Sequence, residues 1–145
     1  MEINFKKVHT GKDLAISAIV IIAGIALFFV SKGLGICIAA CGLLMLLCCK
    51  GGYKKDGQGA VLTKKSEDLC KACKVPLADF LNGKDCNPSI KKGSEGGSVR
   101  LDVYYNKAEG IGYAQLFDFC NYAYEPLTGV VELNGDNMNR IISQL

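Results

Sequence analysis

Two long apolar runs near the N-terminus, separated by only three residues, are the strongest constraint on how this chain can fold. Residues 14–30 (LAISAIVIIAGIALFFV) and 34–49 (LGICIAACGLLMLLCC) contain no charged side chain. Each run makes a helix of roughly 25 Å, a little under the bilayer's hydrocarbon thickness of about 30 Å. Because the 80 residues from 66 to 145 cannot bury two such helices, the pattern predicts a transmembrane helical hairpin.

The lysines around the two runs predict how this hairpin is oriented. The turn between the runs contains only Lys32, whereas the flanking segments contain Lys6, Lys7, Lys12, Lys50, Lys54, Lys55, Lys64 and Lys65. Positive charge near the ends of a span favours the cytoplasmic side of a membrane. The sequence therefore predicts a two-span integral membrane protein with both termini in the cytoplasm.

Two other interpretations of the N-terminal part stay open. A basic start and an apolar stretch also make a signal peptide, but cleavage near residue 30 would leave a second apolar run at the new N-terminus. Ile38, Ala39, Ala40 and Cys41 resemble the lipobox at which bacterial lipoproteins are cleaved. A lipidated Cys41 would then be followed by GLLMLLCC, whereas lipoproteins usually continue with a polar tether.

The chain is predicted to divide into three parts. Residues 1–50 contain the N-terminal segment and the hairpin, and residues 51–65 (GGYKKDGQGAVLTKK) read as a basic flexible tether because of their glycines and polar side chains. Residues 66–145 are predicted to form a small cytosolic α+β head. A head of this size is marginally stable by itself, so self-association or help from the membrane is expected.

The head is predicted to contain an antiparallel β-meander with flanking helices. Ser66 is a good N-cap for a helix that Pro76 would kink and that would end near Gly83. Alternating or continuous apolar residues predict three strands, over 99–105, 112–124 and 129–133. Asp136 is expected to cap a final helix, which would cover one face of the sheet.

Charge is distributed unevenly between the two halves of the chain. Residues 1–65 carry a net charge of +6 and residues 66–145 a net charge of −3, within a total of +3. The basic half therefore suits a membrane surface, and membrane lipids are the predicted partners. Nucleic-acid binding by the head is disfavoured, because a mildly acidic surface repels phosphates.

The head contains four of the eight cysteines: Cys70, Cys73, Cys86 and Cys120. In a cytosolic head these thiols stay reduced. Cys70-x-x-Cys73-Lys74 resembles the thioredoxin motif, which implies a redox pair, although no buried strand leads into it. A zinc site built from all four cysteines is a weaker alternative, since Cys86 and Cys120 are far apart in the sequence. Cys48 and Cys49, at the end of the second run, are placed where S-acylation occurs.

Enzymatic chemistry is not predicted, and neither is a cofactor. His9 is the only histidine and precedes the first run, so the head cannot assemble a Ser-His-Asp triad or a Cys-His pair. Catalysis would fall to carboxylates such as Asp118 or Glu125. We expect Asp118 to be solvated or to form an ion pair with Arg100 instead.

Binding is the function that the residues of the head favour. Seven aromatic residues fall between positions 104 and 124, and strand alternation should expose some of them. The candidate ligand- or partner-binding residues are Tyr104, Tyr113, Tyr122, Tyr124 and Arg100. Small residues in the second apolar run are candidates for helix packing and self-association: Gly35, Ala39 and Gly42.

The sequence thus predicts a small integral membrane protein whose head is a binding or oligomerisation module for a protein or small-ligand partner. One alternative is a ligand-gated, nucleotide-sensing membrane effector, because two membrane spans with a cytosolic head loosely resemble the layout of such effectors. Another is a membrane-tethered thiol oxidoreductase that uses Cys70 and Cys73.

Overall fold

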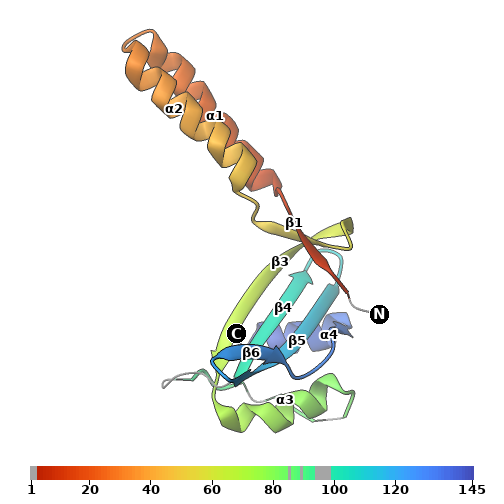
Figure 1. The fold of residues 1–145 in the computed structure, drawn as a ribbon. Coiled ribbons are helices and arrows are strands. Elements are labelled where there is room, and N and C mark those ends of the chain that lie inside the picture. Colours follow the sequence, from red (N-terminus) through yellow and green to blue (C-terminus); the bar gives the residue numbers. More distant parts are fainter. Residues whose placement is uncertain (1–2, 85, 89, 94–98) are drawn as a thin grey trace. The chain divides into compact units, whose positions relative to one another are not determined.

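The computed structural model describes residues 3–84, 86–88, 90–93 and 99–145, and its elements fall into two compact units. We call residues 5–61 the hairpin unit, and Ile3, Asn4 and residues 62–145 the head (Figure 1). Within the described residues there are four α-helices, and all strand pairs are antiparallel. The α+β fold class predicted from the sequence is therefore confirmed.

The hairpin unit contains two long apolar helices, α1 (Gly11–Phe28) and α2 (Lys32–Cys48), which are packed side by side (Figure 1). Glycines bring their backbones together. A Cβ atom on Gly24 would overlap the backbone of Ala39, and one on Gly35 would overlap that of Phe28. A Cβ atom on Gly42 would lie 2.7 Å from Cγ1 of Ile21. Gly35, Ala39 and Gly42, the predicted packing residues, thus contact α1 of the same chain.

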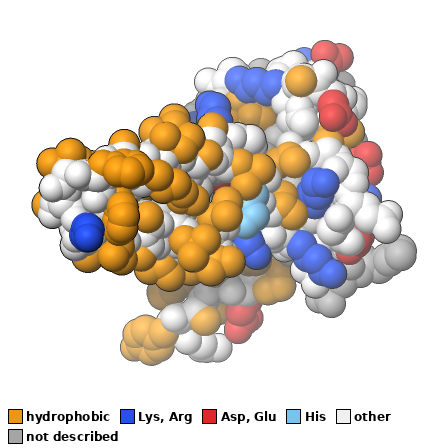
Figure 2. Space-filling model, turned by 90° about the horizontal axis from the view of Figure 1, so that it is seen from above, with side chains coloured by type: hydrophobic (Ala, Val, Ile, Leu, Met, Phe, Trp, Pro, Cys, Tyr) orange, Lys and Arg blue, Asp and Glu red, His pale blue; other side chains and the backbone are white. Residues whose placement is uncertain are grey.

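Large apolar side chains cover the outer surface of the helix pair, as Figure 2 shows. By length and composition α1 is able to cross a membrane, whereas α2, with 17 residues, is a shorter apolar helix. Signal sequences and buried helices of soluble proteins meet the same criterion as α1. The prediction of two spans is confirmed only as far as one helix that could span a membrane.

Polar contacts join the start of α1 to the residues after α2, at the end of the helix pair that we call its base. Thr10 and Asp13 form a capping box at the start of α1, with Oδ2 of Asp13 accepting a hydrogen bond of 2.9 Å from the backbone N–H of Thr10. The same oxygen accepts the backbone N–H of Gly51 at 2.9 Å. Nδ1 of His9 donates to the carbonyl oxygen of Cys49 at 2.8 Å. The residues entering α1 are therefore fixed to those leaving α2.

The segment predicted to be a flexible tether, residues 51–65, instead forms strands, so that prediction is wrong. Strand β1 (Phe5–Val8) pairs with β2 (Gly52–Lys55), and β2 is bonded to the first part of β3 (Gln58–Leu69). Asp56 and Gly57 have φ values of 50° and 78°. Positive φ at both central residues makes a type I′ turn, the usual connection of a two-residue β-hairpin.

The sheet of the head is built from the rest of β3 with β4 (Val99–Asn106), β5 (Ile111–Cys120), β6 (Ala123–Pro126) and β7 (Val131–Leu133). Residues 63–69 of β3 pair with β4, β4 pairs with β5, and both β6 and β7 pair with β5. The predicted helix start at Ser66 is wrong, because Ser66 lies within β3 opposite Asp102.

Two further sequence predictions need correction in detail. The strand predicted over 112–124 is two strands, β5 and β6, joined at Asn121 and Tyr122, whose φ values are 51° and 63°. The helix predicted to be kinked at Pro76 begins only at residue 74, as α3 (Lys74–Leu81) after a short 3₁₀ turn (Lys71–Cys73). Pro76 thus lies in the first turn, where its missing N–H costs no helical hydrogen bond.

The core of the head lies between one face of the sheet and the helices α3 and α4 (Gly135–Ile142). Every second residue of β4 points into it: Val99, Leu101 and Val103 are fully buried. They meet Leu77 of α3 and Ile141 of α4. The predicted final helix is therefore confirmed, although its N-cap is Asn134, which accepts the backbone N–H of Asn137 at 2.8 Å, rather than Asp136.

Two neighbouring substitutions on α3 test this packing. Leu77 is 0% exposed and Val75 is 67% exposed. Leu77→Ala should lower the free energy of unfolding by about 2–5 kcal/mol because it leaves a cavity in the core. Val75→Ala should change it by less than about 0.5 kcal/mol. Urea unfolding of the detergent-solubilised full chain, followed by tyrosine fluorescence, measures both, and equal effects would contradict the assignment of the core.

Candidate binding site on the sheet

The face of the sheet that points away from the core is built from alternate residues of three adjacent strands. Arg100, Asp102 and Tyr104 of β4 lie on this face between their partners on β3 and β5. We call it the polar face. Each row across it contains one residue of β3, one of β4 and one of β5, in that order, and the rows are Asp68, Arg100 and Phe117; Ser66, Asp102 and Gln115; and Lys64, Tyr104 and Tyr113. In the described part of the head, α3 and α4 pack on the opposite, core face. Neither helix therefore covers the polar face, on which Asp102 and Tyr113 are buried and Ser66 and Asp68 are exposed.

A buried carboxylate lies at the centre of the polar face. Asp102 is only 2% exposed, and its oxygens are 2.7 Å from Nζ of Lys64 and 2.8 Å from Oγ of Ser66, which donates a hydrogen bond. Burying a charge costs free energy unless partners compensate it, and these groups supply that compensation. Desolvation alone would lower the pKa of Lys64, but the hydrogen bond and charge of Asp102 outweigh it and raise that pKa.

Arg100 is stacked between two aromatic rings. Its guanidinium carbon lies 4.8 Å from the ring centroid of Phe117 and 4.5 Å from that of Tyr124. Nε of Arg100 is buried and lies 3.2 Å from Oδ1 of Asp102, but the contact lacks the alignment of a hydrogen bond. The stack and the ion pair therefore fix the plane of the guanidinium, while the side chain stays 32% exposed.

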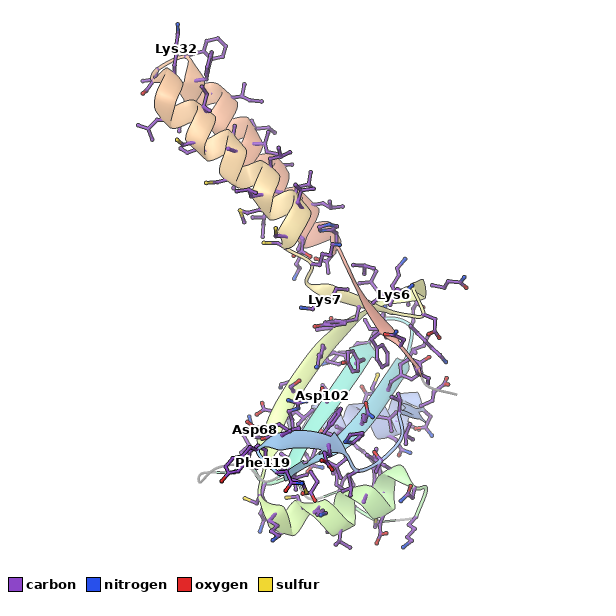
Figure 3. All side chains as sticks on the ribbon, viewed as in Figure 1. Lys6, Lys7, Lys32, Asp68, Asp102 and Phe119 are labelled. Atoms are coloured by element: carbon purple, nitrogen blue, oxygen red, sulfur yellow. The ribbon has the colours of Figure 1, made fainter. Side chains whose placement is uncertain are left out.

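The aromatic stack continues along the same end of the sheet. The hydroxyl of Tyr124 donates to Oδ1 of Asp68 at 3.1 Å, and its ring packs edge-on against Phe119 with centroids 5.2 Å apart. Figure 3 labels Asp68, Asp102 and Phe119 on these strands. Desolvation, followed by the hydrogen bond to Asp68, raises the pKa of Tyr124. This tyrosine therefore stays a neutral hydrogen-bond donor at physiological pH.

A cavity of about 720 Å³ is lined by Gln115, by residues 3–4, and by Pro126 with the loop 127–130 that follows it. This loop separates β6 from β7 and leaves the sheet opposite the middle of β5. Residues of this loop still bond β5. Oγ1 of Thr128 accepts the backbone N–H of Leu116 at 3.1 Å, its carbonyl accepts Nε2 of Gln115 at 3.3 Å, and the backbone N–H of Leu127 donates to the carbonyl of Leu116 at 2.8 Å. A break in the edge strand thus opens a cavity next to the polar face.

The structure brings some of the predicted binding residues together and separates others. Arg100 and Tyr124 are in direct contact, and Tyr104 lies directly opposite Tyr113 in the ladder. Tyr113 is only 7% exposed, whereas Tyr122, at the β5–β6 turn, is 98% exposed.

Sequence reasoning missed Asp102, Lys64 and Phe117. For Asp102 the signal was present, because strand alternation places it on the same face as Arg100 and Tyr104.

Asp118 does not form the predicted ion pair with Arg100. It lies on the other face of β5 and pairs with Lys74 of α3, which lowers the pKa of Asp118 mainly through their hydrogen bond. Cys120 is 3.6 Å from the same carboxylate. Desolvation, then the charge of Asp118, raises the pKa of the Cys120 thiol.

The cysteines of the head do not come together as a metal site. Among the described residues no group of three His, Cys, Asp or Glu side chains could hold a metal ion, so the four cysteines of the zinc alternative are not brought together there. Cys70 and Cys73 instead bond the segment 91–92: Sγ of Cys70 donates to the carbonyl of Lys92, and Sγ of Cys73 accepts the N–H of Lys91, both at 3.3 Å. Cys86 donates to the carbonyl of Pro76 at 3.6 Å.

Comparison with protein families, with curated proteins and with solved structures finds no match to this chain.

The ion pair of Asp118 with Lys74 predicts that the stability of the head depends on pH. Because the folded-state pKa lies below the unfolded-state value, the pair stabilises the head at neutral pH, and this contribution is lost as the pH falls below about 4. Lys74→Met should raise the pKa of Asp118 toward its ordinary value and make unfolding less sensitive to acid. NMR titration of the carboxyl groups measures this. Lys71→Met, in the preceding 3₁₀ turn, is the matched control, and an equal shift there would contradict the pairing.

Proposed function

We propose that this protein is a small integral membrane protein that is anchored by α1 and α2 and binds a partner through the polar face of its head. The observation that carries the binding part is the fixed guanidinium of Arg100 on a sheet face that neither α3 nor α4 covers. A fixed guanidinium beside aromatic rings is suited to a carboxylate or phosphate carried next to a flat apolar group. Arg and Tyr are also enriched where protein interfaces gain most of their energy.

The exposed apolar surface of the helix pair supports the membrane part of the proposal. Side chains such as Ile19, Ile22 and Leu47 are more than 60% exposed along α1 and α2. Two adjacent helices with apolar outer surfaces are stable in lipid and would aggregate in water. The positions of Lys6, Lys12 and Lys50 at one end of the pair favour a cytoplasmic location for that end and for the head.

A ligand-sensing role is the second candidate, and the cavity beside Gln115 is the observation that favours it. Its volume of about 720 Å³ lies within the range of about 300–1,000 Å³ for small-molecule sites. By contrast, no observation favours the thiol oxidoreductase alternative. Cys73 is buried, and the thiols of Cys70 and Cys73 bond backbone groups that hold segment 91–92 in place.

Topology is tested by labelling single cysteines in a variant that lacks the native thiols. Cysteine at Ser31, between the helices, and at Lys107, an exposed residue of the head, should be labelled from opposite sides of the membrane. In intact cells an impermeant maleimide should reach position 31 and not position 107. Labelling of both positions from the same side would refute two membrane crossings.

The binding face is tested by photo-crosslinking in cells. p-Benzoylphenylalanine at Tyr104, on the polar face, should give a discrete adduct, whereas the same group at the exposed Val75 on α3 should not. Arg100→Lys, which keeps the charge but loses the stacked plane, should weaken the adduct at least several-fold. An unchanged midpoint of urea unfolding would show that the Arg100→Lys variant is still folded. The mass of the adduct separates a second copy from another protein, and equal adducts at both positions, or none, would overturn the proposal.

A further inference from the structure

The strands of the hairpin unit continue its helices without a flexible break. Strand β1 leads into α1 through His9 and Thr10, and three residues, 49–51, separate α2 from β2. The bonds from Asp13 to Gly51 and from His9 to Cys49 fix the two strands where the helices end. The β1–β2 ladder is therefore placed by the same contacts that hold the base of the helix pair together.

Lysines are concentrated on this ladder and at the adjoining helix ends. The ladder carries Lys6, Lys7, Lys54 and Lys55, and Lys12 and Lys50 flank it. Figure 3 shows Lys6 and Lys7 at the end of the helix pair opposite to Lys32. Among the described residues, neither Lys6 nor Lys54 forms an ion pair with a carboxylate.

Lys6 and Lys54 lie directly opposite each other in the register of the ladder. Directly opposed residues of an antiparallel pair project from the same face, so their charges repel and destabilise the pairing. An anion held by both ammonium groups would remove that repulsion. Within the ladder, the other pair on this face, Val8 and Gly52, carries no charge, and the nearest acid along the chain is Asp56 in the turn after β2.

We propose that Lys6 and Lys54 together bind the phosphate headgroups of anionic lipids at the bilayer surface from which α1 and α2 emerge. This inference rests on the membrane anchoring proposed above. The location selects a lipid over a soluble phosphate, because the ladder begins where two apolar helices end, which is the level of the headgroups. A lysine near an anionic bilayer surface raises the protein's affinity for that surface by about five-fold at most, and added salt weakens this attraction.

The test is electron spin resonance of the full chain reconstituted in phosphatidylcholine bilayers. Trace spin-labelled phosphatidylglycerol or phosphatidylcholine reports the fraction of each lipid immobilised by the protein. Phosphatidylglycerol should be selected over phosphatidylcholine by roughly two- to five-fold. The double variant Lys6→Gln/Lys54→Gln should abolish this selectivity, and Lys6→Arg/Lys54→Arg should retain it. Lys32→Gln makes the same chemical change at the other end of the helix pair and should have little effect.

Each other outcome overturns the inference in a recognisable way. Equal immobilisation of both lipids by the native chain would refute selective headgroup binding while leaving the anchoring intact. No immobilised lipid at all would refute both the anchoring and the lipid site. An equal loss of selectivity in Lys32→Gln would refute the assignment to Lys6 and Lys54. Loss of selectivity on addition of inorganic phosphate at constant ionic strength would show a site for free phosphate instead.

Discussion

Strand β4 is the element on which the head depends, because its two faces carry opposite kinds of interaction. Val99, Leu101 and Val103 form the centre of the apolar core, whereas Arg100 and Asp102 bring charge to the other face. A charge in the middle of a sheet is tolerated only when its neighbours satisfy it. The pairing of β3 with β4 meets this requirement, because it places Lys64 and Ser66 beside Asp102.

This arrangement would link the stability of the polar face to the binding proposed for it. Losing one partner of a buried ion pair typically costs about 3–5 kcal/mol, and the partial exposure of Lys64 places this pair towards the lower end. Arg100 contributes differently, since its plane is held by Phe117 and Tyr124 and its outer edge stays accessible. A residue held in this way loses little side-chain entropy when a partner binds, which favours affinity.

The sequence was sufficient to predict features with a local signal. The apolar runs indicated α1 and α2, and the alternation in β4 indicated a strand with one buried face. Asp56-Gly57 is also a strong local turn signal, but the glycines around it were interpreted as flexibility. Ser66, Glu67 and Asp68 match a helix start, yet they form a strand because pairing with β4 outweighs local propensity.

The rest of the candidate site depends on contacts that no local pattern contains. The ion pair of Lys64 with Asp102 and the hydrogen bond of Tyr124 with Asp68 join residues that are far apart in the sequence. The cavity lies where Thr128, outside any strand, bonds β5 through its side-chain hydroxyl. Such features follow from the register, which is fixed only when all strands have assembled.

The use of the glycines within the hairpin also limits how copies of this chain could associate. Gly24, Gly35 and Gly42 allow α1 and α2 to approach each other, so these positions are not free for contacts between copies. The outward faces carry large aliphatic side chains, and in a bilayer these pack against lipid about as well as against another helix. In the proposed membrane setting, the hairpin unit would therefore supply little drive for oligomerisation. Self-association would have to come from the head, where a second copy would compete for the polar face with any other partner.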